Sequence, residues 1–174
     1  MGSCHLILVL MKPIETPFST IFIGFEQAYI YVWVSLEYKF MYVGMTNSRV
    51  GTLGRANQHL DMRGTLRERF LMEFGLDIDT VSDLRLYSFP LPKSYLFFSV
   101  ESTYREAVEY LVQKQLLEMI SQLSVKYSII SRVRSNERTR NSRIRNLANE
   151  IIIQLIKNLP QPNETDQRLI GRIS

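Results

Sequence analysis

Residues 29–44 read YIYVWVSLEYKFMYVG. Aromatic side chains at 29, 31 and 33 alternate with isoleucine or valine at 30, 32 and 34, and this period of two is typical of a β-strand. Residues 36–38 suit a hairpin connection, after which a second extended run continues until Gly44. The stretch predicts an antiparallel hairpin on which the hydroxyls of Tyr31 and Tyr42 can converge on one face.

Regular patterns continue on both sides of this hairpin. Two β-rich runs precede it, at Leu6–Met11 and Phe18–Phe25, and proline residues separate them. After the hairpin, the patterns predict four helices, over Thr52–Leu60, Thr65–Phe74, Thr103–Leu123 and Asn146–Leu159. They also predict a strand over Leu84–Phe89. Two segments are open: Tyr95–Val100 suits a strand or a core loop, and Val125–Ile130 suits a strand or a continuation of the preceding helix.

The helix expected over residues 65–74 has signals at both ends. Thr65 with Glu68 three residues later matches a capping box, and Gly75 is a typical C-terminal stop. The order of elements predicts an α+β fold. We expect a small central antiparallel sheet flanked by helices, with extra N-terminal strands and a C-terminal basic helical extension.

The positive charge of the chain is concentrated in one segment. The net charge is +4, from 21 Lys and Arg against 17 Asp and Glu. Residues 131–150 hold six arginines and two glutamates, so this segment accounts for the whole excess. Arginine at all six positions favours bidentate contacts with phosphate or guanine and predicts a DNA-binding segment. These residues are Arg132, Arg134, Arg138, Arg140, Arg143 and Arg145.

Composition excludes several other classes. The single cysteine, Cys4, cannot form an internal disulfide, and the two histidines, His5 and His59, are too far apart in sequence to suggest a zinc enzyme. No apolar run reaches the roughly 18 residues that cross a bilayer. The short apolar run at residues 5–11 fits a buried strand better than a signal peptide. We therefore expect a cytoplasmic protein with no membrane segment.

A polar turn after the hairpin leads to Arg55 and His59, which lie four residues apart and so share one face of the expected helix. Together with Tyr31 and the Tyr42-Val43-Gly44 triplet, which ten intervening residues separate, this set resembles the GIY-YIG nuclease family. Tyr31 matches the tyrosine of the first triplet, residues 42–44 match the second, and Arg55 and His59 match the arginine and the residue one turn on. The resemblance covers residues 28–120.

The resemblance implies a metal-dependent DNA endonuclease of restriction or phage type. It implies that Tyr31 activates the attacking water, that Tyr42 positions water or the hydration of the metal, and that Arg55 neutralises the scissile phosphate. His59 would assist proton transfer or hydrogen-bond Tyr31 or a phosphate oxygen. One glutamate would hold a single Mg²⁺ ion, with Mn²⁺ as a substitute. Glu109 is the preferred candidate for this glutamate, and Glu101 is the alternative.

The sequence departs from the family pattern at three points. Tyr29 stands where the family has the first glycine. Arg55 lies eleven residues after Gly44, a few more than usual, which leaves Arg49 as a competing arginine and a further DNA contact. The asparagine that many members carry a dozen or so residues after the glutamate has no counterpart here.

The resemblance, the N-terminal β-rich runs and the position of the arginines together suggest four segments in the chain. Residues 1–27 would add strands to the core, 28–124 would form the catalytic module, 125–159 would form the basic helical extension that contacts DNA, and 160–174 would be a polar tail. Double-stranded DNA is the expected partner, and cutting both strands suits a homodimer. Two alternatives stay open: a non-cleaving nucleic-acid-binding or regulatory protein on the same scaffold, and an α/β protein whose basic stretch contacts a protein partner.

Overall fold

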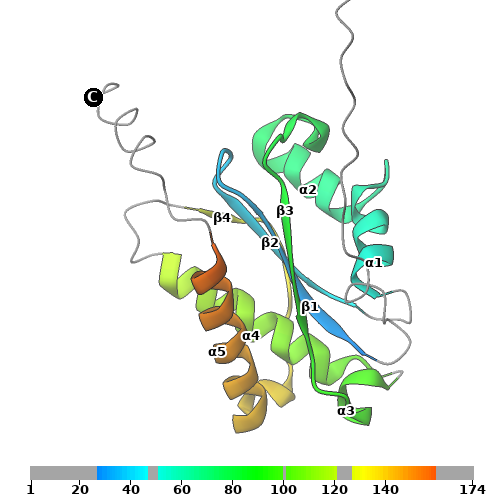
Figure 1. Ribbon diagram of the computed structural model, residues 1–174, viewed down its shortest axis with the longest axis vertical. Helices are drawn as coiled ribbons and strands as arrows, with labels where there is room; N and C mark the ends of the chain where they lie inside the picture. Colours follow the sequence, from blue (N-terminus) through cyan, green and yellow to red (C-terminus); the bar gives the residue numbers. More distant parts are fainter. Residues whose placement is uncertain (1–26, 47–50, 100, 121–126, 160–174) are drawn as a thin grey trace, which may run out of the picture.

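The computed structural model describes residues 27–46, 51–99, 101–120 and 127–159, and these form an α+β fold around a four-stranded sheet (Figure 1). The strands lie in the order β3-β1-β2-β4. They are β1 (Tyr29–Ser35), β2 (Phe40–Met45), β3 (Arg85–Pro90) and β4 (Ser128–Ile129). The α+β class is thus confirmed, whereas the two strands expected over Leu6–Met11 and Phe18–Phe25 lie outside the described residues.

The hairpin expected at residues 29–44 forms the centre of the sheet. Strand β1 pairs antiparallel with both β2 and β3, and Tyr31 lies directly opposite Gly44. The sheet is mixed and not wholly antiparallel, because β4 pairs with β2 in parallel. A parallel pair needs a long crossover connection, and the chain between these two strands contains several helices.

Five α-helices and two short 3₁₀ helices accompany the sheet within the described ranges. The α-helices are α1 (Gly51–Leu60), α2 (Thr65–Phe74), α3 (Tyr95–Phe98), α4 (Thr103–Ile120) and α5 (Ser142–Asn158). The 3₁₀ helices are η1 (Ile78–Thr80) and η2 (Glu137–Arg140). No helix of this described part is long and apolar enough to cross a membrane.

Three local predictions need correction. Residues 95–98 form a helical turn, neither strand nor loop, because the Ser94 side chain accepts the backbone N–H of Leu96 and caps it. Helix α5 begins at Ser142, four residues early, because Asn141 caps it. The expected capping box is absent from α2, whose N-cap is Gly64 and not Thr65. A Cβ on residue 64 would overlap the carbonyl group of His59, so the tight turn between α1 and α2 needs glycine there.

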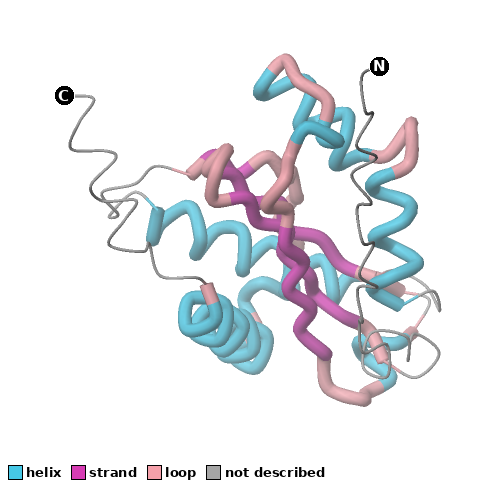
Figure 2. The backbone as a smooth tube through the Cα atoms, turned by 45° about the horizontal axis from the view of Figure 1, so that its top comes forward, coloured by secondary structure: helices cyan, strands magenta, loops and turns pink. Residues whose placement is uncertain are grey.

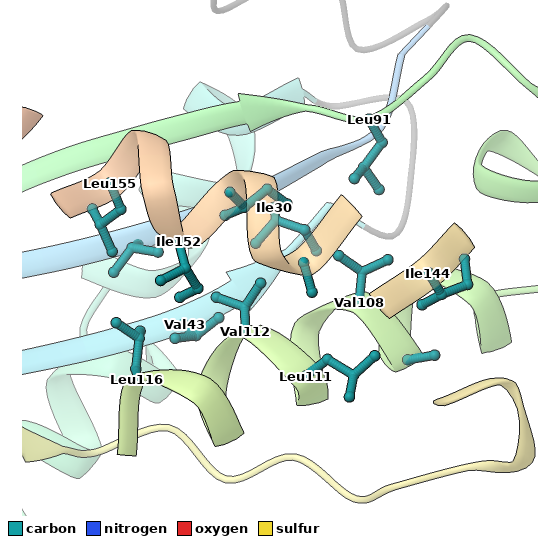
Figure 3. Packing of buried hydrophobic residues seen from close by; sticks show 14 of the residues in the cluster. Ile30, Val43, Leu91, Val108, Leu111, Val112, Leu116, Ile144, Ile152 and Leu155 are labelled. Atoms are coloured by element: carbon teal, nitrogen blue, oxygen red, sulfur yellow. The ribbon is translucent and has the colours of Figure 1, made fainter. Parts of the chain in front are cut away.

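Alternate residues of the central strands build two apolar layers, and helices lie on both sides of the sheet (Figure 2). Ile30, Val32 and Val34 point toward α4 and α5, where they pack in the larger cluster shown in Figure 3. Tyr31, Trp33 and Tyr42 point to the opposite face. There they pack with Ala56 of α1 and with Leu66 and Phe70 of α2.

The described residues after β4, up to the end of α5, pack along α4. Helix α5 contacts α4, and the chain between β4 and α5 follows the same helix (Figure 3). Ser131 Oγ hydrogen-bonds Gln113 Oε1 at 3.1 Å, and Asn136 Nδ2 donates to the carbonyl of Thr103 at 2.8 Å. This segment therefore runs antiparallel to α4, and residues 132–135 lie between two contacts that bracket the N-terminal half of that helix.

Candidate functional site

A buried pair formed by Tyr31 of β1 and His59 of α1 is the centre of the candidate site. Each residue is only 2% exposed, and the Tyr31 hydroxyl is hydrogen-bonded to Nε2 of His59. Burial, together with the charges of Arg55 and Arg69, lowers the pKa of His59 to about 4. Burial also raises the pKa of Tyr31 well above its usual value. At neutral pH the pair is therefore a neutral phenol hydrogen-bonded to a neutral imidazole.

Gly44 gives the Tyr31 ring its position. These two residues face each other across the β1–β2 pair, and the phenol lies over the glycine backbone. A Cβ on residue 44 would overlap three atoms of the phenol, Cε2, Cζ and the hydroxyl oxygen. The last residue of the Tyr42-Val43-Gly44 triplet is thus required by close packing, in addition to ending the extended run.

Tyr42 contacts the same histidine. Its ring meets His59 edge-on with 5.1 Å between ring centroids, while the Tyr31 and His59 centroids are 5.5 Å apart. Burial raises the pKa of Tyr42, so it too is a neutral phenol near pH 7. The structure therefore brings both predicted tyrosines and the predicted histidine together on one face of the sheet.

Arg55 lies one helical turn before His59 on α1. Its charge lowers the pKa values of Tyr31, His59 and Glu109, so its guanidinium is within electrostatic range of all three. One terminal nitrogen donates to Gln58 Oε1 at 2.7 Å, whereas Nε is buried and has no hydrogen-bond partner among the described residues. A buried donor that lacks a partner is costly, and an anion bound in the site would satisfy it.

The structure separates the two glutamate candidates. Glu109 is half-buried on α4, and its charge raises the pKa values of both Tyr31 and Tyr42. Glu101 is exposed and precedes the first residue of α4. Burial, followed by the neighbouring charge of Glu106, raises the pKa of Glu109 to about 7, although Arg55 and Arg69 oppose this shift. Of the two candidates, Glu109 is therefore the one whose charge acts on both tyrosines.

The residues present fit the Mg²⁺ ion that the resemblance implies. In the described ranges, no hydrogen bond or ion pair engages the Glu109 carboxylate, so its oxygens are available to a cation. No group of three or more His, Cys, Asp or Glu side chains able to hold a metal occurs in this described part. A single carboxylate suits Mg²⁺, which keeps most of its water ligands.

One residue of the cluster was missed by the sequence analysis. Arg69 of α2 lies with its Cζ 5.8 Å from the centroid of the Tyr42 ring, and its charge lowers the pKa values of Tyr42, His59 and Glu109. The available signal was its place directly before Phe70, which is buried against the sheet. That position at the border of the buried side of α2 carries a side chain toward the neighbouring strand.

The predicted DNA-binding arginines all lie at the surface, where they are described. The six arginines between residues 132 and 145 are exposed, and Arg49 lies outside the described residues. Arg138 stacks over the Tyr104 ring at 5.1 Å and is 3.3 Å from the Glu137 carboxylate. Arg132 and Arg134 belong to the segment between the contacts to Gln113 and Thr103, and Glu109 lies in the part of α4 that these contacts bracket.

No protein-family model, curated protein or solved structure matches this chain at a significant level. The chemistry of the clustered side chains is therefore what indicates a function for this protein.

Proposed function

We propose that the protein is a Mg²⁺-dependent endonuclease that hydrolyses phosphodiester bonds of double-stranded DNA, of the restriction or phage type. The observation that carries this proposal is the buried hydrogen bond between Tyr31 and His59, in a cluster with Tyr42, Arg55 and Glu109. The cluster combines a proton-accepting pair, a cation for phosphate and a carboxylate for a metal. Phosphodiester hydrolysis needs these three functions.

The Tyr31–His59 pair suits activation of a water molecule. As the water oxygen attacks phosphorus, its proton passes to the Tyr31 oxygen, and the phenol proton passes to Nε2 of His59. The new phosphorus–oxygen bond replaces the bond to the leaving oxygen, which takes its proton from solvent. Tyr31 remains neutral throughout, which agrees with the strongly raised pKa of its buried hydroxyl.

Phosphate binding would prepare His59 to accept that proton. The low pKa of His59 disfavours its protonation in the free protein, and the charges of Arg55 and Arg69 are two of the causes. A phosphate diester bound beside these arginines offsets their charge and raises the basicity of the imidazole. Proton transfer is thus favoured only when the substrate occupies the site.

Arg55 and Glu109 would act on the charge of the reacting group. The Arg55 guanidinium donates to the phosphate oxygens through the Nε that lacks a partner in the described structure. Glu109 would hold the Mg²⁺ ion, which when bound supplies positive charge beside the phosphate. Burial and the charge of Glu106 raise the pKa of Glu109, whereas the positive charge of a bound ion would lower it and favour the ionised carboxylate.

The exposed arginines from 132 to 145 would hold the duplex beside the cluster. Because a single cluster cuts one strand at a time, we further propose that a homodimer cuts both. A cytoplasmic location is part of the same proposal, since this is where such a nuclease meets DNA.

Incubation with long duplex DNA of mixed sequence distinguishes a nuclease from a protein that only binds. We expect the wild type to cut in Mg²⁺ and not in EDTA, and Glu109→Gln to bind the DNA without cutting it. Glu101→Gln is the matched control, because it removes an exposed carboxylate outside the cluster and should cut normally. A wild-type protein that binds duplex DNA but leaves it intact would show that the non-cleaving alternative is correct.

A further inference from the structure

Helix α2 carries two arginines in opposite electrostatic situations. Arg67 is neutralised by two carboxylates, because it forms ion pairs with Asp77 and, at 2.7 Å, with Asp79. Arg69 forms no ion pair with any carboxylate of the described residues. Arg67 therefore connects α2 to η1 through ion pairs, whereas the positive charge of Arg69 is available to bind an anion.

A backbone contact holds Arg69 in place. One terminal nitrogen donates to the carbonyl of Ile130 at 3.1 Å, and the guanidinium lies beside the Tyr42 ring. Ile130 in turn donates its N–H to Met41 at 3.0 Å, and the next residue, Ser131, accepts the N–H of Val43 at 3.1 Å. The chain that positions Arg69 is thus itself fixed to β2, so the guanidinium has a defined location.

Arg69 occupies the junction between the two regions that we propose contact DNA. On one side are Tyr42 and His59 of the cluster, whose pKa values its charge lowers. On the other side, the Ile130 carbonyl that it binds lies two residues before Arg132, the first of the exposed arginines. A DNA strand that runs from Arg55 to Arg132 passes this guanidinium.

We propose that Arg69 binds a second phosphate of the cut strand. This phosphate is next to the scissile phosphate, on the side of the basic segment, which is the stretch of exposed arginines from 132 to 145. This inference rests on the proposed function. One nitrogen is committed to Ile130, and the other two have no recorded partner in the described structure, so they form a donor pair of the kind that binds phosphate oxygens. Arg69 thereby fixes the direction in which the strand crosses the cluster.

Binding of a duplex that carries the site cut by the wild type tests this inference. Measurements in EDTA over a range of salt concentrations compare the wild type with Arg69→Met, Arg69→Lys and the control Arg85→Met. Arg85 is exposed at the first position of β3, opposite Val34 and outside the cluster. Its replacement by methionine removes one positive charge, as Arg69→Met does. We expect Arg69→Met to weaken binding about tenfold or more and to reduce the salt slope by about 0.9. Arg69→Lys should restore the slope, and Arg85→Met should leave both unchanged.

Neutral methylphosphonate linkages, placed one at a time in the cut strand, identify the phosphate. At the position next to the scissile phosphate, the neutral linkage should weaken DNA binding by the wild type. It should not weaken binding by Arg69→Met any further, because the linkage and the substitution remove the same contact. Equal responses of wild type and variant at every position, or a shared effect only at the scissile phosphate, would overturn the inference. A wild type that cuts no DNA would instead overturn the proposed function and this inference with it.

Discussion

The Tyr31 hydroxyl is hydrogen-bonded to Nε2 of His59, although these residues are 28 positions apart in the chain. The bond joins a central strand of the sheet to the helix that follows the hairpin. Tyr42 contacts the same imidazole, so the histidine meets two buried phenols. The hairpin and α1 are thereby arranged around a single proton acceptor.

Gly44→Ala should displace the Tyr31 ring and abolish cleavage. The added methyl group overlaps the phenol, and overpacking of a buried site costs about 1–3 kcal/mol of unfolding free energy. Cleavage rate and chemical unfolding are measured together. Gly75→Ala is the matched control: residue 75 has a φ of 69° and open space around it, so alanine should cost about 1 kcal/mol and leave cleavage intact. Normal cleavage by Gly44→Ala would refute the packing argument.

Stability should fall as the pH drops from about 6.5 to about 4. The folded protein holds His59 at a pKa of about 4, below the ordinary 6.5, so the unfolded chain binds more protons within this window. The loss attributable to His59 is about 3 kcal/mol. Urea unfolding of the wild type and of His59→Asn at pH 7 and pH 4 measures it as a difference. If the two proteins lose equal stability, His59 is not held neutral by burial.

Glu109→Gln should raise the unfolding free energy at pH 8 when no divalent cation is present. Burial holds the folded pKa of Glu109 near 7, above the ordinary 4.5, so the folded state loses stability as the pH rises from about 4.5 to about 7, and the full cost is present at pH 8. The amide removes that cost. Mg²⁺ should stabilise the wild type and not the variant, which thermal unfolding with and without the ion will show. Equal stabilisation of both proteins would place the ion elsewhere.

Replacement of Arg132, Arg134 and Arg140 by glutamine should weaken DNA binding and leave the chemistry unchanged. All three side chains are exposed and lie outside the cluster. The loss of three phosphate contacts lowers the salt slope by about 2.7. Single-turnover cleavage at saturating DNA should match the wild-type rate. Wild-type affinity in this variant would contradict the proposed role of the basic segment.

Local signals in the sequence predicted most of the fold. The period of two in residues 29–34 predicted a strand, and Gly75 was predicted to end a helix. Both features depend on residues close together in the sequence, and both predictions are confirmed. The wrong predictions involve contacts between residues that the local sequence pattern does not reveal. Thr65 has the side chain of a cap, yet the turn that brings residue 64 against His59 moves the cap to glycine.

The same distinction applies to the candidate site. The spacing of Arg55 and His59 fixes their common face on α1, and the structure places them with the two tyrosines. Arg69 joins this cluster only because α2 packs back over β2, which no spacing in the sequence reveals. The course of residues 132–135 along α4 likewise depends on side-chain contacts to Gln113 and Thr103.

A double-mutant cycle on cleavage tests most directly whether Tyr31 and His59 act as one unit. Single-turnover rates are compared for the wild type, Tyr31→Phe, His59→Gln and the double variant, with Tyr87→Phe as a control. The Tyr87 hydroxyl lies on β3 and donates to the Asn158 carbonyl at 3.3 Å, outside the cluster. Folding and DNA affinity are checked for every protein.

The account predicts that each single change in the pair slows cleavage by about 10²–10⁴-fold. The double variant should be no slower than the slower single variant, because both changes remove the same proton relay. Tyr87→Phe should cut at the wild-type rate. Losses that multiply in the double variant, or a Tyr31→Phe protein that cuts normally, would contradict the central claim.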